Sequence, residues 1–312
     1  MSSNDPMIYN FNLLKSRVFD TLKLTDVSKQ IKKVKGPTLC IGSGGSKVVA
    51  TFASIVLNHK NKCVCKVMEP RDALYENISS YKNLFVCSYS GNNHGVDIVK
   101  NFKLKKHLLT YGDNNQDDYI KLKCNSSIDK EMSFISIGAT LMPMSILLDY
   151  YLKEDSHHLI DKIISRCENM NFQSIDTSIP FELMSGQDTI TSEIYLESTF
   201  VESGLSDLIV HHKYDYCHGR STLSYKQDKN LIYLISNRNE LDNHLLTQLE
   251  SKYKSIIILE SDYSDPVINN FDLTIKSIYL SKHLADLKNM DLSIVDYNKD
   301  LCKKLYKYKG EM

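Results

Sequence analysis

The chain has 312 residues, and its 38 Lys and Arg residues balance its 38 Asp and Glu residues to a formal net charge of zero. This balance leaves no long-range field that would draw the chain to nucleic acid or to an acidic membrane surface, so we expect neither partner. No apolar run reaches the ~18 to 20 residues that span a bilayer. Residues 1–10 hold no apolar signal core, so we expect a cytoplasmic protein whose eight cysteines are reduced.

The first half of the chain alternates short apolar runs with helical patterns. The apolar runs predict strands at residues 38–41, 63–68, 84–88 and 107–111. Helical periodicity covers residues 47–57, and the run 134–151 is apolar on every side, which indicates a buried helix. Strands that are separated by helices predict a parallel sheet with right-handed crossovers.

The second half repeats this order after a polar helical stretch at residues 155–176. We place a domain boundary at its end, which gives an N-terminal domain of residues 1–176 and a C-terminal domain of residues 177–312. Strands are predicted at 181–184, 231–235 and 255–259, and helices at 189–204, 239–253 and 272–288. We therefore expect an α/β fold of two doubly wound, three-layer parallel-sheet domains in tandem, with Gly44 and Gly186 at equivalent turns.

A glycine-rich turn, Gly42-Ser43-Gly44-Gly45-Ser46, joins the first strand to the first helix of this pattern. Glycine lets the backbone approach a ligand closely, and a helix N-terminus offers free N–H groups to an anion. The spacing matches neither a Walker A loop nor GxGxxG. By itself the turn is compatible with an anion site that includes Gly44, Gly45 and Ser46, or with a tight structural turn.

A second polar loop, Ser88-Tyr89-Ser90-Gly91-Asn92-Asn93, follows the third predicted strand and precedes a helix. Two hydroxyls and two amides around one helix start can surround a phosphate or a sugar with hydrogen bonds. Ser and Asn also cap helices, but one cap needs one such residue. We therefore favour a ligand site here.

Together, these loops resemble those of SIS (sugar isomerase) domains, which are flavodoxin-like. Such domains form phosphosugar isomerases, the isomerase half of glucosamine-6-phosphate synthase and related deglycases. In that family, the serines of Ser-x-Ser-Gly and a hydroxyl residue two positions beyond the Gly bind the sugar phosphate. The resemblance implies this role for Ser88 and Ser90, with Asn92 beside them and Asn93 in place of the hydroxyl residue.

The second half is similar to the family in a further motif. There, a Gly-rich turn opens a helix that carries the catalytic Glu, and a His-Gly-Pro motif follows about 16 residues later. Here Gly186 opens the helix, Glu202 lies on it, and His218 follows at 16 positions, with Arg220 in place of the Pro. The resemblance covers residues 20 to 300, and it implies that Glu202 and His218 are catalytic and that Arg220 lies at the substrate.

The chemistry explains these residue types. Aldose–ketose isomerisation opens the sugar ring and moves a proton between C1 and C2 through an enediol. A carboxylate such as Glu202 can take the C2 proton and return it at C1, and a histidine such as His218 can move the ring-oxygen proton near neutral pH. Serine and backbone N–H groups hold the phosphate, so that remote binding energy positions the reacting carbons.

The resemblance thus implies a phosphosugar aldose–ketose isomerase, or a deglycase or aminosugar isomerase with the same enediol-type proton transfer. The alternative is a non-catalytic sugar-phosphate sensor, which would keep Ser88 and Ser90 but need neither Glu202 nor His218. SIS proteins commonly dimerise so that a neighbouring subunit completes the site, so a homodimer is expected.

No cofactor is expected for this chemistry. We also expect no metal, because the spacing of His211, His212, Cys217 and His218 fits no standard zinc pattern. Cys87 lies in a predicted buried strand with no evident base, so we interpret it as a core residue.

Overall fold

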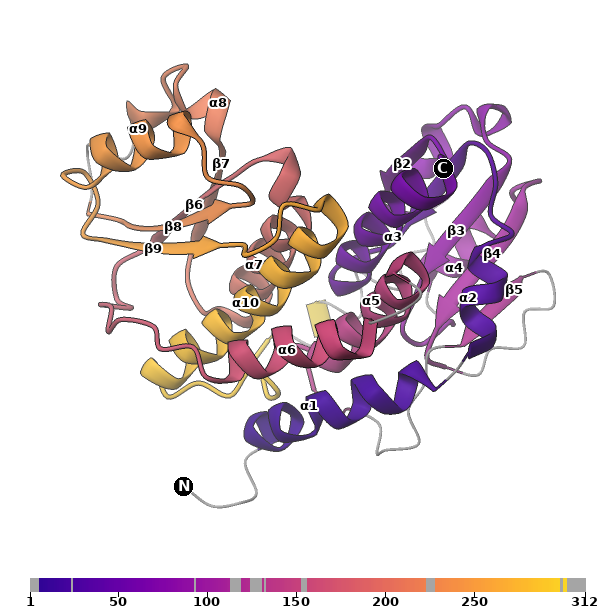
Figure 1. Ribbon diagram of the computed structural model, residues 1–312, viewed down its shortest axis with the longest axis horizontal. Helices are drawn as coiled ribbons and strands as arrows, with labels where there is room; N and C mark the ends of the chain where they lie inside the picture. Colours follow the sequence, from indigo (N-terminus) through magenta and orange to yellow (C-terminus); the bar gives the residue numbers. More distant parts are fainter. Residues whose placement is uncertain are drawn as a thin grey trace.

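The computed structural model describes residues 6–23, 25–92, 94–112, 119–123, 131, 133–152, 156–222, 228–297 and 300–301. Two parallel sheets lie on opposite sides of a layer of helices (Figure 1). Within the described residues, no helix combines the length and apolarity that a membrane-spanning segment needs.

The first sheet has the strand order β2-β1-β3-β4-β5, and every neighbouring pair is parallel. Its strands are β1 (Thr38–Ile41), β2 (Cys65–Met68), β3 (Asn83–Cys87), β4 (Lys105–Thr110) and β5 (Ile120–Lys123). Both faces are buried: Cys40 on β1 packs into the core beneath the central helices, whereas Leu39 and Ile41 face the opposite side. This order places a topological switch point between β1 and β3, where chain crossovers leave the sheet in opposite directions.

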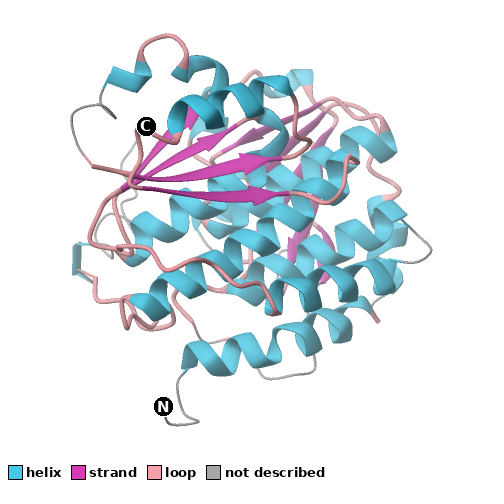
Figure 2. Ribbon diagram, turned by 60° about the vertical axis from the view of Figure 1, so that its left-hand side comes forward, coloured by secondary structure: helices cyan, strands magenta, loops and turns pink. Residues whose placement is uncertain are grey.

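The second sheet has the order β7-β6-β8-β9, and every neighbouring pair is parallel. Figure 2 shows strands of one sheet as arrows that point the same way. Its strands are β6 (Phe181–Ser185), β7 (Leu208–His212), β8 (Asn230–Ile235) and β9 (Ser255–Glu260). The structure therefore contains two parallel-sheet α/β domains, as expected. β5 and β7 were not predicted, because both lie at a sheet edge and alternate or end in Lys and His instead of forming a continuous apolar run.

Helices cover both faces of each sheet. The layer between the sheets comprises α3 (Gly45–Asn61), α5 (Ile137–Leu152), α7 (Ile190–Ser203) and α10 (Pro266–Leu287), which α1 (Pro6–Leu22), α2 (Thr25–Ile31) and α6 (Ser156–Glu168) extend. The outer faces carry η1 (Asp72–Tyr75), η2 (Ile78–Ser80) and α4 (His94–Val99) on the first sheet, and α8 (Lys213–Tyr216) and α9 (Glu240–Leu249) on the second. Each sheet is thus the middle of three layers.

One hydrophobic core runs through the central layer and joins the two halves of the chain. Phe52 of α3 and Phe271 of α10 meet in it, with ring centroids 6.1 Å apart. Phe11 of α1 meets Tyr279 of α10 edge-on at 5.4 Å. α5 is buried on almost every side, as its uninterrupted apolar run predicts.

The start of α10 shows how local sequence sets a helix boundary. We expected this helix from residue 272, but it begins at Pro266. The Asp265 carboxylate accepts hydrogen bonds from the backbone N–H groups of Val267 and Ile268, at 2.9 and 3.1 Å. A side-chain cap followed by Pro at the first helical position is a strong helix start, and it outweighs the polar Asn residues that follow.

A buried ionic cluster ties α6 to α10. Asp272 of α10 is fully buried and accepts from the guanidinium of Arg166 on α6 at 2.5 Å. Lys276, one turn further along α10, lies 3.1 Å from the same carboxylate. Each buried charge in this cluster has an opposite partner. The cluster therefore fixes the packing of α6 against α10.

His107 is a fully buried imidazole on β4, stacked on Phe85. In the described part of the chain, neither of its ring nitrogens has a hydrogen-bond partner. Burial, helped by the charge of Lys105, lowers the pKa of His107 from 6.5 to about 4. The folded protein therefore holds His107 neutral, whereas the unfolded chain binds a proton there below pH 6.5.

This difference predicts acid sensitivity. His107 contributes stability above pH 6.5 that is lost as the pH falls towards 4, and the loss amounts to about 3 kcal/mol. His107→Leu should flatten the pH dependence of the free energy of unfolding by that amount, as measured by urea unfolding across this window. Replacing the exposed imidazole in His244→Gln is the control, and an unchanged slope in His107→Leu would contradict the assignment.

Candidate active site

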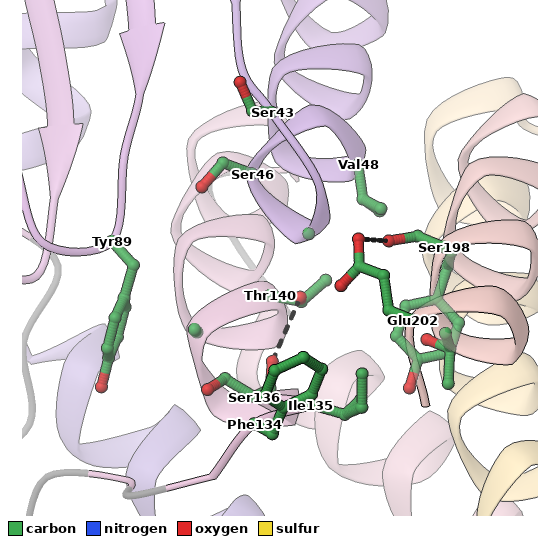
Figure 3. A pocket seen from close by; sticks show the side chains of 14 residues that line it. Ser43, Ser46, Val48, Tyr89, Phe134, Ile135, Ser136, Thr140, Ser198 and Glu202 are labelled. Carbon is green, nitrogen blue, oxygen red and sulfur yellow. Dashed lines mark hydrogen bonds between the residues drawn. The ribbon is translucent and has the colours of Figure 1, made fainter. Parts of the chain in front are cut away.

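A cavity of about 170 Å³ lies where the N-terminal turns of α3 and α5 meet the C-terminal half of α7 (Figure 3). α3 begins at the carboxyl end of β1, the edge where parallel α/β sheets bind ligands. Hydroxyl groups line much of the wall. They belong to Ser43, Ser46, Tyr89, Ser136, Thr140, Tyr195, Ser198 and Thr199. Hydroxyls both donate and accept hydrogen bonds, which suits a polyhydroxylated ligand.

The glycine-rich turn forms one side of this cavity through Ser43, Gly45 and Ser46. Gly44 caps α3 with a φ of 53°, a left-handed conformation that glycine adopts without strain. Gly42 packs so closely on the helix start that an added Cβ would lie 2.3 Å from the carbonyl oxygen of Ser46. The turn therefore needs these glycines to bring the start of α3 to the cavity. Within the turn, the N–H groups of Ser46 and Lys47 donate to the carbonyls of Ser43 and Gly44, at 3.1 and 2.8 Å.

Gly186 occupies the corresponding turn after β6 but has a different backbone. It caps the short helix η3 (Gln187–Thr189) with a φ of −147°, in extended conformation. Both turns follow the first strand of their own sheet, as we expected. However, Gly44 has a positive φ and Gly186 does not. The two turns are therefore equivalent in topology but differ in local geometry.

Glu202 lies on the last turn of α7 and lines the cavity opposite α3. Ser198, one turn earlier, donates a hydrogen bond to Glu202 Oε1 at 2.7 Å. A Cβ built on Gly44 would lie 3.4 Å from the same oxygen, so the carboxylate faces the N-terminus of α3 directly (Figure 3). The structure thus brings the predicted catalytic Glu and the glycine-rich turn to one cavity.

The serine loop reaches this cavity mainly through Tyr89. Ser88 is buried, its Oγ accepts from the Gly91 N–H at 3.2 Å, and it lines a narrow adjoining space of about 10 Å³ together with Ser46 and Tyr89. Ser90 is exposed, and its Oγ accepts from the backbone N–H of Asn92 at 3.4 Å.

Of the other predicted residues in this loop, Asn92 is exposed, and Asn93 lies outside the described residues. In this structure the Ser88 and Ser90 hydroxyls therefore shape the loop. Their predicted contact with a phosphate remains a prediction.

A larger cavity of about 670 Å³ continues beyond Glu202 and Ser198, which line both spaces. Gly44 and Arg220 also line it, Arg220 from the short helix η4 (Arg220–Thr222). Lys47 lies 3.4 Å from Glu69 on its wall. The main cavity shares Ser198 and Glu202 with the larger one, and Ser46 and Tyr89 with the space beside Ser88. These three adjoining spaces, from the serine loop to Arg220, are called the trough below.

His218 lies on an exposed turn outside these three cavities. Its backbone N–H donates to the carbonyl of Asp215 at 2.9 Å. Within one copy of the chain, the described residues therefore do not bring His218 to Glu202. No cluster of three or more metal-ligating side chains was found among the described residues.

Sequence reasoning missed the hydroxyls of α5 and α7. Ser136 and Thr140 are four residues apart, as are Tyr195 and Thr199, so each pair presents its hydroxyls on one helical face. Polar residues at this spacing within a largely apolar helix were the available signal. It was obscured because α5 is buried on almost every side, and because α7 carries further polar residues on its exposed face.

No family model and no curated protein matches the sequence of this chain. Solved structures do match its fold. Glucosamine-6-phosphate deaminase from Thermotoga maritima has a TM-score of 0.69 and 15% identity, with 94% of this chain and 98% of that chain covered. Tagatose-6-phosphate ketose/aldose isomerase from Escherichia coli has a TM-score of 0.67 and 12% identity, covering 94% and 95%.

The C-terminal domain of glucosamine-fructose-6-phosphate aminotransferase from Francisella tularensis matches with a TM-score of 0.63 and 12% identity, covering 96% of this chain and 100% of that chain. At these identities the likeness shows the fold alone. The chain has the fold of SIS-type phosphosugar isomerases, which agrees with the resemblance seen in its loops.

The packing at the glycine-rich turn can be tested by paired substitutions. Gly42→Ala should lower the free energy of unfolding by about 1 to 3 kcal/mol, because its Cβ meets the backbone of α3. Gly45→Ala should change it by less than about 0.5 kcal/mol, because its Cβ would lie 3.6 Å from Thr140 Oγ1. Urea unfolding measures both, and equal losses in the two variants would show that the turn is packed differently.

Proposed function

We propose that the chain binds a sugar phosphate, or an amino derivative of one, in the trough and isomerises it by moving a proton between C1 and C2. The observation that carries this proposal is the position of Glu202. Its carboxylate lines two adjoining cavities and faces the N-terminus of α3 directly, and hydroxyl groups line much of the main cavity beside it. A carboxylate in that place can reach the carbons of a bound sugar while the helix N-terminus attracts its anionic group.

In the proposed reaction, Glu202 removes the proton from C2 of the open-chain aldose, and the electrons shift to form a C1–C2 enediol. The same carboxyl then returns the proton to C1 while the proton of the C2 hydroxyl passes to O1, which leaves the ketose. The hydrogen bond from Ser198 holds Oε1 in one orientation, so the other oxygen is available to the substrate. A positioned general base of this kind accelerates proton transfer by about 10²- to 10⁴-fold.

The phosphate would lie at the end of the trough where the glycine-rich turn meets the serine loop. Support comes from Ser46, which lines both the main cavity and the space beside Ser88. Gly44, Gly45 and Ser46 supply the first turn of α3, whose positive end favours an anion. Ser90 and Asn92 remain proposed ligands that would have to turn towards the phosphate.

The proposed architecture is a pair of SIS-type domains, residues 1–176 and 177–312, and the proposed assembly is a homodimer. The exposure of His218 supports the dimer. His218 does not line the cavity of its own copy, so an imidazole that opens the sugar ring there would have to come from another copy. We propose that the partner subunit supplies this imidazole.

The base assignment predicts a specific loss. Glu202→Gln keeps the shape of the side chain and can still accept from Ser198, but it cannot take a proton. Exchange of the C2 proton with solvent deuterium, followed by NMR over a panel of hexose and pentose phosphates, should fall by about 100-fold or more. Calorimetric affinity for the same sugar phosphate should remain within a few fold, because the hydroxyl wall is intact.

Glu250→Gln, which removes an exposed carboxylate at the end of α9, is the matched control and should exchange like the wild type. Persistent exchange in Glu202→Gln would assign the base to another residue.

The phosphate position predicts a loss of binding. Replacing both Ser88 and Ser90 by Ala removes two hydroxyls and leaves the N–H groups of Gly91 and Asn92 without the acceptors that hold the loop. The affinity for a sugar phosphate should fall by about 1 to 3 kcal/mol, measured by calorimetry. Ser54→Ala, whose hydroxyl bonds within α3 at the Thr51 carbonyl, should bind normally. Unchanged affinity in the double variant would place the phosphate elsewhere.

A sugar-phosphate sensor is the second candidate function. It is favoured by one observation, namely that the described residues of a single copy place Glu202 but not His218 at the cavity. Binding of a sugar phosphate without proton exchange, in the wild-type protein and across the whole panel, would identify a sensor.

A further inference from the structure

We propose that Tyr195 is a specificity-determining residue, whose phenol hydroxyl binds the hydroxyl group on a middle carbon, C3 or C4, of the sugar. The proposal deepens the proposed function, on which it rests, and it names a feature that the ligand must carry. It starts from a buried polar group on the wall of the main cavity that the folded chain itself does not use.

The hydroxyl of Tyr195 is buried without a partner. The residue is 3% exposed, and among the described residues no group makes a hydrogen bond with the phenol oxygen. In contrast, Tyr150 of α5 donates to Asn61. Tyr151, next to it on α5, donates to Asp265 at 2.8 Å. A buried hydroxyl without a hydrogen bond costs stability, and phenylalanine would fill the same space without that cost.

The phenol of Tyr195 is a protonated donor. Burial raises its pKa, so the group keeps its proton at neutral pH. The hydroxyls of Thr199 and Ser281 lie near enough to act on this pKa in the opposite direction, but neither has hydrogen-bonding geometry with the phenol. Ser281 donates instead to the carbonyl of Ser277 at 3.0 Å. The proton and lone pairs of Tyr195 are therefore free to pair with another oxygen.

The main cavity is the place where such an oxygen can come from outside the chain. Tyr195 lines it together with three later residues of α7, namely Ser198, Thr199 and Glu202. These follow Tyr195 by three, four and seven positions, the spacing of one helical face. In this structure the phenol oxygen is shielded from solvent. Contact with a ligand therefore requires the ring to tilt towards the cavity that it lines.

The other proposed contacts leave the middle of the sugar for Tyr195. Glu202 is proposed to act at C1 and C2, and the start of α3 with the serine loop is proposed to hold the phosphate. Tyr195 lies two helical turns from Glu202, about 10 Å along the axis of α7, so it faces a different part of the sugar. The hydroxyls on C3 and C4 take no part in the proton transfer and do not carry the phosphate. A sugar hydroxyl both donates and accepts, which complements the phenol.

The test combines one substitution with ligands that each lack one hydroxyl. The probes are glucose 6-phosphate and its 2-deoxy, 3-deoxy and 4-deoxy analogues, measured by calorimetry on the full chain. The wild type should bind either the 3-deoxy or the 4-deoxy analogue about 10-fold more weakly than glucose 6-phosphate, because a site that pairs with a hydroxyl disfavours the analogue without it. Tyr195→Phe should bind glucose 6-phosphate about 10-fold more weakly and should no longer distinguish it from that analogue.

Stability separates this contact from a structural role. The hydroxyl has no partner among the described residues, so Tyr195→Phe should keep or raise the urea midpoint of unfolding in the absence of a sugar phosphate. In the isomerase assay KM should rise about 10-fold while kcat changes little, because the contact is made equally before and during proton transfer. Tyr214→Phe is the control. It removes a 62% exposed phenol outside the three cavities and should match the wild type in every readout.

Distinct outcomes overturn the proposal. Equal losses for the 3-deoxy and 4-deoxy analogues in the wild type and in Tyr195→Phe would assign these hydroxyls to other residues. Coupling of Tyr195 to the 2-deoxy analogue would place it at the reacting carbons. A lower urea midpoint with unchanged affinity would make the hydroxyl structural. All three results leave the proposed function standing.

Two failures of binding have different consequences. If none of the four probes binds the wild type, the proposal is overturned for sugars of the glucose configuration. If the whole panel of hexose and pentose phosphates also fails to bind, the proposed function itself is contradicted.

Discussion

The structure depends on one constraint: two parallel sheets that must bury both faces share a single layer of helices. Parallel sheets expose no polar face to water, so each needs helices on both sides. Here α3 and α5 from one half and α7 and α10 from the other fill one continuous core, in which Phe52 and Phe271 meet. The packing that stabilises the fold therefore also fixes the relative position of the two halves. As a result, core contacts position any site that lies between them.

This shared layer explains why the candidate site forms where it does. The N-terminus of α3 and the C-terminus of α7 meet at one edge of the layer, so the positive end of one helix faces the carboxylate of Glu202 on the other. The glycine-rich turn supplies the start of α3, and α5 and α7 supply hydroxyls.

Patterns that depend on local chemistry were predictable from the sequence. The strand at residues 38–41 was predicted with the bounds that β1 has, and the turn that follows it was recognised from its glycines. Edge strands β5 and β7 were missed because Lys and His residues interrupt or end their apolar runs. The hydroxyls of Ser136 and Thr199 could not be assigned to a site, because only the packing of both α5 and α7 on α3 shows that they share a cavity. His218 shows that a matching sequence spacing does not establish proximity in space. It follows Glu202 at the spacing of the family motif, but the described residues of one copy do not bring the two side chains together.

The central claim is that Glu202 stands at the reacting carbons of a sugar phosphate. A crystal structure of the protein with a bound hexose phosphate tests it most directly. The account predicts the phosphate between the first turn of α3 and the serine loop, and C2 beside the Glu202 carboxylate, with its hydroxyl in hydrogen-bond reach at about 2.6 to 3.2 Å. A sugar phosphate that is well ordered in the trough but has its C1 and C2 turned away from Glu202, or one that is bound outside the trough, would contradict the account.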